Sequence, residues 1–448
     1  MTMRNIETTL RALLRSADRP ALESLASQLA PHDWAALLPR LDPAEVELLL
    51  QMVPDSALPA VLGALDPGDA AAHLRETAPS AAAGLLAALA PDDAADIIAR
   101  LPAAEIEPLL VRLDADDAAE IRDLMAFAPD SAGGLMTPAF VAVAPDLRAG
   151  QAIAALQRVA DEAETVAYVY VLDRDDHLLG VLSLHRLVLT HPDTPVRQLM
   201  VTDPVRIRAD ADQESAARLL NDHGLIALPV VDDENHLLGI ITQDDIADVV
   251  EAEATEDIER LGGSQPLEMP YLRAGVGRLV RRRVIWLLLL FAAEAYTGTV
   301  LRHFEDEITQ VVALSFFIPL LIGTGGNVGS QVTTTLVRAL AVGEVRPRDV
   351  RAVLLKESAV GLALGAIMAV VALGRSQLLN VGIDVGLVIA LTILAICVWS
   401  AAVAAVLPLA LRSLRIDPAI VSAPLITTLV DGTGLVIYFT IAKYLLHL

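Results

Sequence analysis

Two stretches in the C-terminal third of the chain combine polar residues or glycines with long apolar flanks. The first, residues 319–331, reads Pro-Leu-Leu-Ile-Gly-Thr-Gly-Gly-Asn-Val-Gly-Ser-Gln. The second, residues 427–434, reads Thr-Thr-Leu-Val-Asp-Gly-Thr-Gly and contains the carboxylate Asp431. An ionised group between flanks apolar enough to cross a bilayer is costly, and it indicates an ion or substrate pathway. We therefore expect Asp431 to bind a cation inside a membrane pore.

The glycine-rich stretch also predicts how its own span is built. It places a proline, four glycines and two amides at membrane depth. Because lipid offers no hydrogen-bond partners, broken backbone at that depth must be buried in protein or line a wet cavity. We expect the helix to break at these glycines, beside a path for a polar solute.

Five long apolar segments predict the membrane domain, which we assign to residues 271–448. A span needs about 20 apolar residues, and the expected helices occupy about residues 284–301, 308–341, 353–373, 385–411 and 419–446. Basic side chains are more numerous at the span ends that lie on the same side of the membrane as Arg278, Arg281, Arg282 and Arg283. Because basic flanks stay in the cytosol, this predicts a cytosolic N-terminus and a C-terminus outside. No apolar segment follows the first residues, so we expect no cleavable signal.

Charge is divided unevenly along the chain. The formal net charge is −24, but residues 1–271 carry 47 acidic and 18 basic side chains, whereas residues 272–448 carry 10 and 15. The strongly acidic N-terminal region argues against nucleic acid as a partner. It favours a surface that binds cations. The single cysteine, Cys397, excludes an intrachain disulfide and agrees with a cytosolic soluble region.

An internal repeat within residues 1–129 predicts a stack of short helices. The tripeptides that mark it recur every 24 residues, at Leu41-Asp-Pro, Leu65-Asp-Pro, Leu89-Ala-Pro and Leu113-Asp-Ala. Aspartate suits a helix N-cap and proline the first turn, so each unit should begin a helix that buries one face on its neighbours. Asp92, Asp93 and Asp96 share one helix face, which is either a solvated surface or half of a divalent-cation site.

Residues 130–190 and 191–250 share a second duplicated pattern. Each half has a short β-run, an amphipathic helix, an apolar strand and then His177-Leu-Leu-Gly-Val-Leu-Ser183 or His236-Leu-Leu-Gly-Ile-Ile-Thr242. This order resembles a tandem cystathionine-β-synthase (CBS) pair, an α/β regulatory module. Such pairs often bind ATP or another adenine nucleotide, and Thr242 and Asp245 match the nucleotide-contacting positions, whereas Arg186 departs from them in the first half. The alternative is a purely structural regulatory dimer.

Residues 244–270 connect this pair to the membrane domain. Apolar Ile246, Val249 and Val250 lie on one face and acidic side chains cover the rest, so we expect one long amphipathic helix that ends at Gly262. Such a charge run is usually a solvated face. Its position between a regulatory pair and a membrane domain favours a role in coupling the two.

Taken in order, these motifs resemble the MgtE family of magnesium channels, and the match covers nearly the whole chain. The motifs that carry it are Asp92-Asp-Ala-Ala-Asp96, the CBS pair, Glu251-Ala-Glu-Ala-Thr-Glu-Asp-Ile258, Phe304-Glu305, residues 319–331 and residues 417–418 and 427–435. The resemblance implies a multidomain integral membrane protein with an all-α repeat domain, an α/β CBS pair, a long connecting helix and five membrane helices. It implies a homodimer, surrounded by lipid in the plasma (inner) membrane, that imports Mg²⁺ and is not an enzyme.

The resemblance also implies site residues. Asp431 of both subunits would bind hydrated Mg²⁺ in a pore, and the pore would be lined by Gly325, Gly326, Asn327, Gly329 and Gln331. Cytosolic Mg²⁺ would close the pore by binding Asp92, Asp93, Asp96, Glu214, Asp245, Asp248, Glu253, Glu256, Asp257 and Asp417. Ala423, directly before Pro424, departs from the resemblance, because relatives have a polar residue at that position.

Three alternatives to this function differ in how well the sequence fits them. A CBS-regulated intramembrane metalloprotease would need a motif such as His-Glu-x-x-His, which the sequence lacks. A membrane Mg²⁺ sensor that does not conduct would leave the glycines and amides of the second span unexplained. A transporter that prefers Co²⁺, Mn²⁺ or Ni²⁺ has no sequence feature against it, and neither a channel nor a carrier is favoured.

Overall fold

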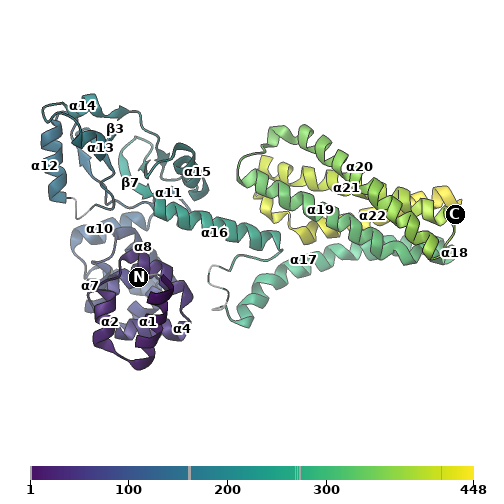
Figure 1. The fold of residues 1–448 in the computed structure, drawn as a ribbon, viewed down its shortest axis with the longest axis horizontal. Coiled ribbons are helices and arrows are strands. Elements are labelled where there is room, and N and C mark those ends of the chain that lie inside the picture. The colour runs from purple at the N-terminus through teal and green to yellow at the C-terminus, as the bar shows by residue number, and fades with distance from the viewer. Residues whose placement is uncertain (1–2, 160–162, 268, 270, 272–273, 415) are drawn as a thin grey trace. The chain divides into compact units, whose positions relative to one another are not determined.

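The computed structural model describes residues 3–159, 163–267, 269, 271, 274–414 and 416–448. The chain forms two compact units, Met1–Glu253 and Ala254–Leu448 (Figure 1). The connecting helix α16 (Gln243–Leu261) runs from one into the other and ends directly before Gly262, as expected. Residues 268 and 270, at the end of the expected connecting segment, lie outside the described residues.

Short helices form the N-terminal part of the first unit, as the repeat predicts. They are α1 (Met3–Ser16), α2 (Arg19–Ala26), α3 (Pro31–Leu37), α4 (Pro43–Met52), α5 (Leu58–Gly63), α6 (Pro67–Glu76), α7 (Pro79–Leu86), α8 (Pro91–Ala99), α9 (Ala103–Leu110) and α10 (Ala115–Leu124). Two of the repeat aspartates cap their helices: the Asp42 carboxylate accepts a hydrogen bond from Glu45 N at 2.8 Å, and that of Asp66 from Gly68 N at 2.9 Å. Asp114 also stands at an N-cap, but its side chain makes no capping hydrogen bond. The apolar faces of the helices share one core.

Two small sheets complete the first unit, and the first three strands of each have the same topology. The first sheet has the order β1 (Ala142–Val143), β2 (Tyr168–Leu172), β3 (Leu178–Ser183), β4 (Val201–Thr202), and the second has β5 (Ile207–Arg208), β6 (Ala227–Val231), β7 (Leu237–Thr242). In each sheet a parallel pair is followed by an antiparallel one. The helices are α11 (Ala132–Leu135), α12 (Ala149–Val159), α13 (Leu184–Val188), α14 (Val196–Leu199) and α15 (Gln213–His223). The predicted duplication is confirmed.

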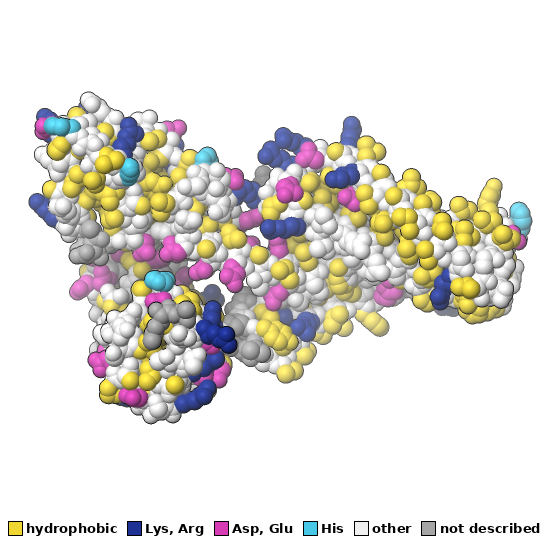
Figure 2. All heavy atoms as spheres, in the orientation of Figure 1, with side chains coloured by type: hydrophobic (Ala, Val, Ile, Leu, Met, Phe, Trp, Pro, Cys, Tyr) yellow, Lys and Arg dark blue, Asp and Glu magenta, His cyan; other side chains and the backbone are white. Residues whose placement is uncertain are grey.

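The described part of the second unit has five helices long and apolar enough to cross a membrane. They are α17 (Val276–His303), α19 (Ile318–Ala341), α20 (Val350–Leu378), α21 (Ile383–Ser413) and α22 (Ala423–Leu446), joined in part by α18 (Glu305–Gln310), η3 (Val312–Phe317), η4 (Pro347–Asp349) and η5 (Pro418–Ile420). Helices α21 and α22 are half buried in the bundle, whereas α17 exposes most of its apolar surface. Hydrophobic side chains accordingly cover much of the visible face of this unit (Figure 2). The multidomain fold class expected from the sequence is confirmed.

The predicted break at the glycine-rich stretch is wrong. Helix α19 is continuous through it, and the irregular backbone precedes the helix, in η3. The glycines instead allow close helix packing, because a Cβ on Gly325 would lie 2.7 Å from both Ile396 and Val430, and one on Gly329 would lie 2.5 Å from Ile426. Small residues permit this approach in membrane bundles, where packing rather than hydrophobicity drives helix association.

Candidate metal sites

The first candidate site brings two acidic helix starts together within the first unit. Helix α8 carries Asp92 and Asp93 in its first turn, and α16 carries Asp244 and Asp245 in its own. Pro91 begins α8, and the positive end of a helix dipole favours carboxylates at such positions. Asp245 acts on Asp93 as a nearby like charge, so the two first turns lie near each other although they are far apart in the sequence.

Burial raises the pKa of the carboxyl groups in this cluster. The pKa of Asp93 rises to about 7, first through desolvation and then through the like charges of Asp92 and Asp245. Desolvation raises the pKa of Asp245 to about 6. It also raises the pKa values of Asp92, Asp96, Glu164 and Asp248. Keeping these groups ionised in a poorly solvated place costs free energy, which a bound cation offsets.

The donor atoms of this cluster fit a hard divalent cation. Oδ1 of Asp92 is buried and has no hydrogen-bond partner among the described residues, while the Thr137 hydroxyl bonds to the same carboxyl group. Mg²⁺ prefers oxygen ligands of this kind. Sequence reasoning missed Thr137, Glu164 and Asp244. Asp244 could have been found, because it belongs to the acidic run that opens α16. Thr137 and Glu164 could not, because contacts between distant segments leave no local pattern in the sequence.

Two of the other expected regulatory residues in the first unit have different partners. The Glu214 carboxylate forms an ion pair with Arg218 at 3.1 Å, one helical turn away in α15. The Glu253 carboxylate accepts a hydrogen bond from Gln213 Nε2 at 2.6 Å. Both contacts involve residues of α15, to which Glu214 itself belongs. A direct role of the two carboxylates in holding a metal stays a prediction.

In the second unit, Glu256 and Asp417 converge on a single guanidinium. Arg260 of α16 forms ion pairs with Glu256 on its own helix and with Asp417 at the N-cap of η5. Asp257 follows Glu256 on α16. The two carboxylates expected to bind Mg²⁺ thus meet at one cationic group, which sequence spacing did not reveal.

Each CBS half also holds a histidine against its own carboxylate. His177 Nδ1 lies 3.1 Å from Asp173 Oδ2, and His236 Nδ1 lies 2.7 Å from Asp232 Oδ2. The two imidazoles stack with their centroids 4.4 Å apart. The stacked rings and the backbone bridge between His177 and His236 join the two halves of the pair. Within each half, the same carboxylate also accepts a backbone N–H of its own turn.

The expected nucleotide contacts are linked to each other. The Thr242 hydroxyl lies 2.6 Å from Asp245 Oδ2, and Asp245 belongs to the acidic cluster. A cavity of about 460 Å³ lies along β5. Its lining includes Arg206, Arg208 and Val231 but neither Thr242 nor Asp245. Both arginines are already paired, Arg206 with Asp203, which also lines the cavity, and Arg208 with Asp210 and Asp233, so neighbouring carboxylates compensate their charges.

The second candidate metal site is Asp431, in α22. Its side chain is 8% exposed, and its Oδ1 atom has no partner in the described part of the chain. Gly432 lets α17 pack closely at this level, against Tyr296 and Thr297, and the buried hydroxyl of Thr297 likewise has no partner among the described residues. A buried acid of this kind inside a helical bundle indicates an ion path.

The residues expected to line a pore divide into two groups. Asn327 and Gln331 are exposed and lie one turn apart on α19, whereas Gly325, Gly326 and Gly329 are buried against α21 and α22. The amides, rather than the glycines, therefore form the polar face of α19. At the start of α22, Ala423 is preceded by the N-cap Ser422, whose buried hydroxyl accepts hydrogen bonds from Leu425 N and Trp286 Nε1.

An acidic helical-repeat domain, a CBS pair and a five-span bundle with a buried carboxylate define a regulated membrane transporter of cations. Family models agree: residues 318–441 match the MgtE divalent cation transporter domain, 29–130 the MgtE intracellular N domain, and 132–190 and 196–252 the CBS domain. The chain is 43% identical to the magnesium transporter MgtE of Thermus thermophilus over 332 residues, 73% of this chain and 72% of that one. It is 36% identical to MgtE of Bacillus subtilis over 72% of this chain and 71% of that one. The chain belongs to the MgtE family of magnesium transporters.

Solved structures support the same fold for the soluble region. The soluble part of a magnesium transporter matches with a TM-score of 0.50 at 30% identity, covering 56% of this chain and 99% of that one. The cytosolic domain of the Mg²⁺ channel MgtE in complex with ATP matches with a TM-score of 0.50 at 36% identity, covering 54% and 99%.

Proposed function

We propose that this protein is a Mg²⁺-selective channel or transporter that imports magnesium across the plasma membrane. The observation that carries the proposal is the buried Asp431 carboxylate, with an unpartnered oxygen, inside a bundle of five candidate spans. Its relatives named as magnesium transporters support Mg²⁺ as the cargo. Mg²⁺ sheds water reluctantly, so two Asp431 side chains in a homodimer would hold the hydrated ion. The basic start of α17 supports a cytosolic N-terminus and a C-terminus outside.

The acidic cluster of the first unit is proposed as the internal Mg²⁺ sensor. Its ionised carboxylates repel each other where Mg²⁺ is scarce, and Mg²⁺ bound between α8 and α16 removes that repulsion. Because α16 continues from this cluster into the membrane unit, its position would report internal Mg²⁺ to the pore. The bound ion would thereby close the pore and prevent overloading.

A second role for the CBS pair is ATP binding. A relative's cytosolic domain was solved with ATP. Arg206 and Arg208 line the cavity along β5, where a phosphate would have to compete with Asp203, Asp210 and Asp233 for them. Titrating ATP into the full-length protein tests this role. Loss of binding in Arg208→Gln is expected, and unchanged binding would move the nucleotide away from this cavity.

The transport proposal is tested by Mg²⁺ uptake into proteoliposomes. We expect Asp431→Asn to abolish uptake while the protein elutes at the size of the wild type. Asp384→Asn is the matched control, because Asp384 is an exposed acid in the first turn of α21, and it should retain uptake. Uptake by Asp431→Asn at the wild-type rate would refute the pore assignment, and competition by Mn²⁺, Co²⁺ and Ni²⁺ in the same assay ranks the ions.

A further inference from the structure

Glu294 is an acidic side chain near the middle of the first membrane helix. It lies in the apolar part of α17, within residues 284–301, and it is exposed on the surface of the single subunit. An ionised carboxylate that faces lipid at this depth is costly, so such a residue instead meets water, a cation or another protein group. Glu294 therefore marks a place where lipid does not cover the outer surface of the bundle.

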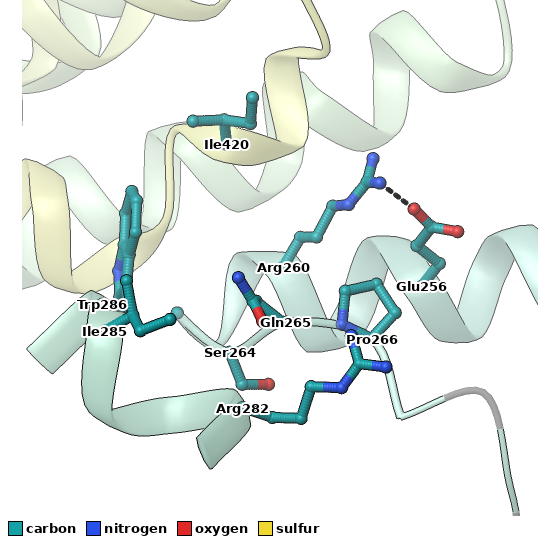
Figure 3. A pocket seen from close by; sticks show the side chains of 10 residues that line it. Glu256, Arg260, Ser264, Gln265, Pro266, Arg282, Ile285, Trp286 and Ile420 are labelled. Atoms are coloured by element: carbon teal, nitrogen blue, oxygen red, sulfur yellow. Dashed lines mark ion pairs between the residues drawn. The ribbon is translucent and has the colours of Figure 1, made fainter.

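The charge of Glu294 is not balanced by a neighbouring base. In the same unit, the carboxylate of Glu256 is neutralised by its ion pair with Arg260 (Figure 3). Among the described residues, by contrast, no basic side chain pairs with Glu294. Its charged neighbour is the Asp431 carboxylate of α22, which Glu294 approaches as a like charge. Two carboxylates from different helices are thus held near each other without a counter-charge in the described part of the subunit.

Helices α17 and α22 pack closely where these two carboxylates lie. Gly432, directly after Asp431, permits the contact, because a Cβ there would lie 2.3 Å from the Tyr296 ring and 3.2 Å from Thr297 Oγ1. Thr297 follows Glu294 by three residues, and residues at this spacing share one face of a helix. The same face of α17 therefore carries Glu294 and Thr297 beside Asp431.

Two buried oxygen atoms at this contact lack hydrogen-bond partners. The side chains of Asp431 and Thr297 are 8% and 5% exposed, and neither Asp431 Oδ1 nor Thr297 Oγ1 has a partner among the described residues. Buried polar atoms are almost always satisfied, so these oxygens indicate a ligand that supplies hydrogen bonds or positive charge. Together with the Glu294 carboxylate they form a set of oxygen donors, which is the kind of ligand that Mg²⁺ and its bound water prefer.

We propose that Glu294 and Thr297 of α17 complete the Asp431 site, so that each subunit offers the hydrated divalent cation two carboxylates and a hydroxyl. The inference rests on the proposed function, which makes Asp431 the transport site, and it adds the residues that set the affinity of that site. Because Asp431 is buried and Glu294 is exposed, the glutamate also connects the site with the surface of the subunit. The second negative charge favours divalent over monovalent cations, since the attraction grows with the charge of the ion.

The Mg²⁺ dependence of uptake into proteoliposomes tests the role of Glu294. We expect Glu294→Gln to raise the external Mg²⁺ concentration for half-maximal uptake about tenfold with little change in the maximal rate, because one carboxylate of the site is lost. Glu294→Asp keeps the charge and should restore most of the affinity. Glu344→Gln, an exposed acid beyond the end of α19, is the matched control and should behave as the wild type. An unchanged half-maximal concentration in Glu294→Gln would overturn the proposal.

Thr297 supplies a second variant that leaves the charge of the site unchanged. Thr297→Val removes the hydroxyl and should raise the half-maximal concentration about threefold, as expected for the loss of one hydrogen bond. Thr299→Val is the matched control, because Thr299 is exposed and its hydroxyl donates to the Ala295 carbonyl at 3.0 Å. Equal effects of the two valine variants would overturn the role of Thr297.

Two further comparisons separate this site from a structural role and from the transport proposal itself. A Glu294→Gln protein that no longer elutes at the wild-type size would assign Glu294 to a contact between protein groups and overturn its role as a ligand. Uptake by Asp431→Asn at the wild-type rate would refute the transport site as a whole. An inactive Asp431→Asn beside an unaffected Glu294→Gln would refute only the added ligands, so the two failures are distinguishable.

Discussion

Asp245, in the first turn of α16, lies close enough to Asp93, in the first turn of α8, to raise the pKa of the Asp93 carboxyl group. The two residues belong to different domains, the CBS pair and the helical repeat, within one compact unit. Both side chains are half-buried, so their repulsion is relieved by what neutralises them: protons at low pH, or a divalent cation at neutral pH. We therefore expect the contact between the domains to be sensitive to internal Mg²⁺.

The internal repeat supplies a matched pair of variants for the sensor. Asp92 lies at the cluster, whereas Asp116, which follows it by 24 residues, occupies the same place in the repeat and is exposed. We expect Asp92→Asn to raise the internal Mg²⁺ needed for half closure on the order of tenfold, because one carboxylate ligand is lost. Patch recordings with varied internal Mg²⁺ measure this shift. Asp116→Asn should behave as the wild type, and an unchanged curve for Asp92→Asn would refute the sensor assignment.

The raised pKa values predict how the stability of the first unit depends on pH. Asp93 has a pKa of about 7 and Asp245 of about 6, against an ordinary value of 3.8. The folded unit therefore binds these protons more tightly than the unfolded chain does. The resulting stabilisation is complete below about pH 4 and is lost as the pH rises through 6 and 7. In EDTA, the thermal midpoint of the full-length protein should fall as the pH is raised from about 5 to 8, and Mg²⁺ should reduce that fall. A pH-independent midpoint in EDTA would contradict the cluster.

Helix packing in the membrane domain can be tested at two glycines of α20. A Cβ on Gly361 would lie 2.7 Å from the backbone carbonyl of Cys397, whereas one on Gly374 would meet nothing within 4 Å. Gly361→Ala should therefore force α20 away from α21 and lower the free energy of unfolding by about 1–3 kcal/mol. Gly374→Ala should be neutral or stabilising by up to about 1 kcal/mol, since alanine favours helix. Thermal unfolding in detergent compares the two, and equal effects would argue against the close α20–α21 contact.

The ion pair between Lys443 and Glu307 ties the end of α22 to α18. Nζ lies 2.9 Å from Oε1, with Glu307 buried and Lys443 largely exposed. Lys443→Met should lower the free energy of unfolding by about 1 kcal/mol, because it leaves a buried carboxylate unpaired while solvent already screens the lysine. Adding Glu307→Gln should recover much of that loss. If the double variant is as unstable as the sum of the singles, the two residues do not interact.

The sequence was sufficient where structure depends on neighbours in the chain. Asp42 and Asp66 accept backbone hydrogen bonds three and two residues ahead, so the repeat of aspartate and proline could be converted into helix starts. The strands β3 and β7 follow the duplicated His-Leu-Leu-Gly pattern in both CBS halves for the same reason. The five apolar segments and the isolated Asp431 depend only on composition and length.

The tertiary structure alone decided what those elements do to each other. Glycine weakens an isolated helix but also lets two helices touch, and Gly325 and Gly329 serve the second purpose because Ile396, Val430 and Ile426 lie opposite. No local pattern specifies that opposition. Likewise, the acids of α8 and α16 were each visible in the sequence, but desolvation and mutual repulsion arise only when folding brings them together. The sequence by itself determined which elements form and which residues are ionisable; packing determined which charges share a site.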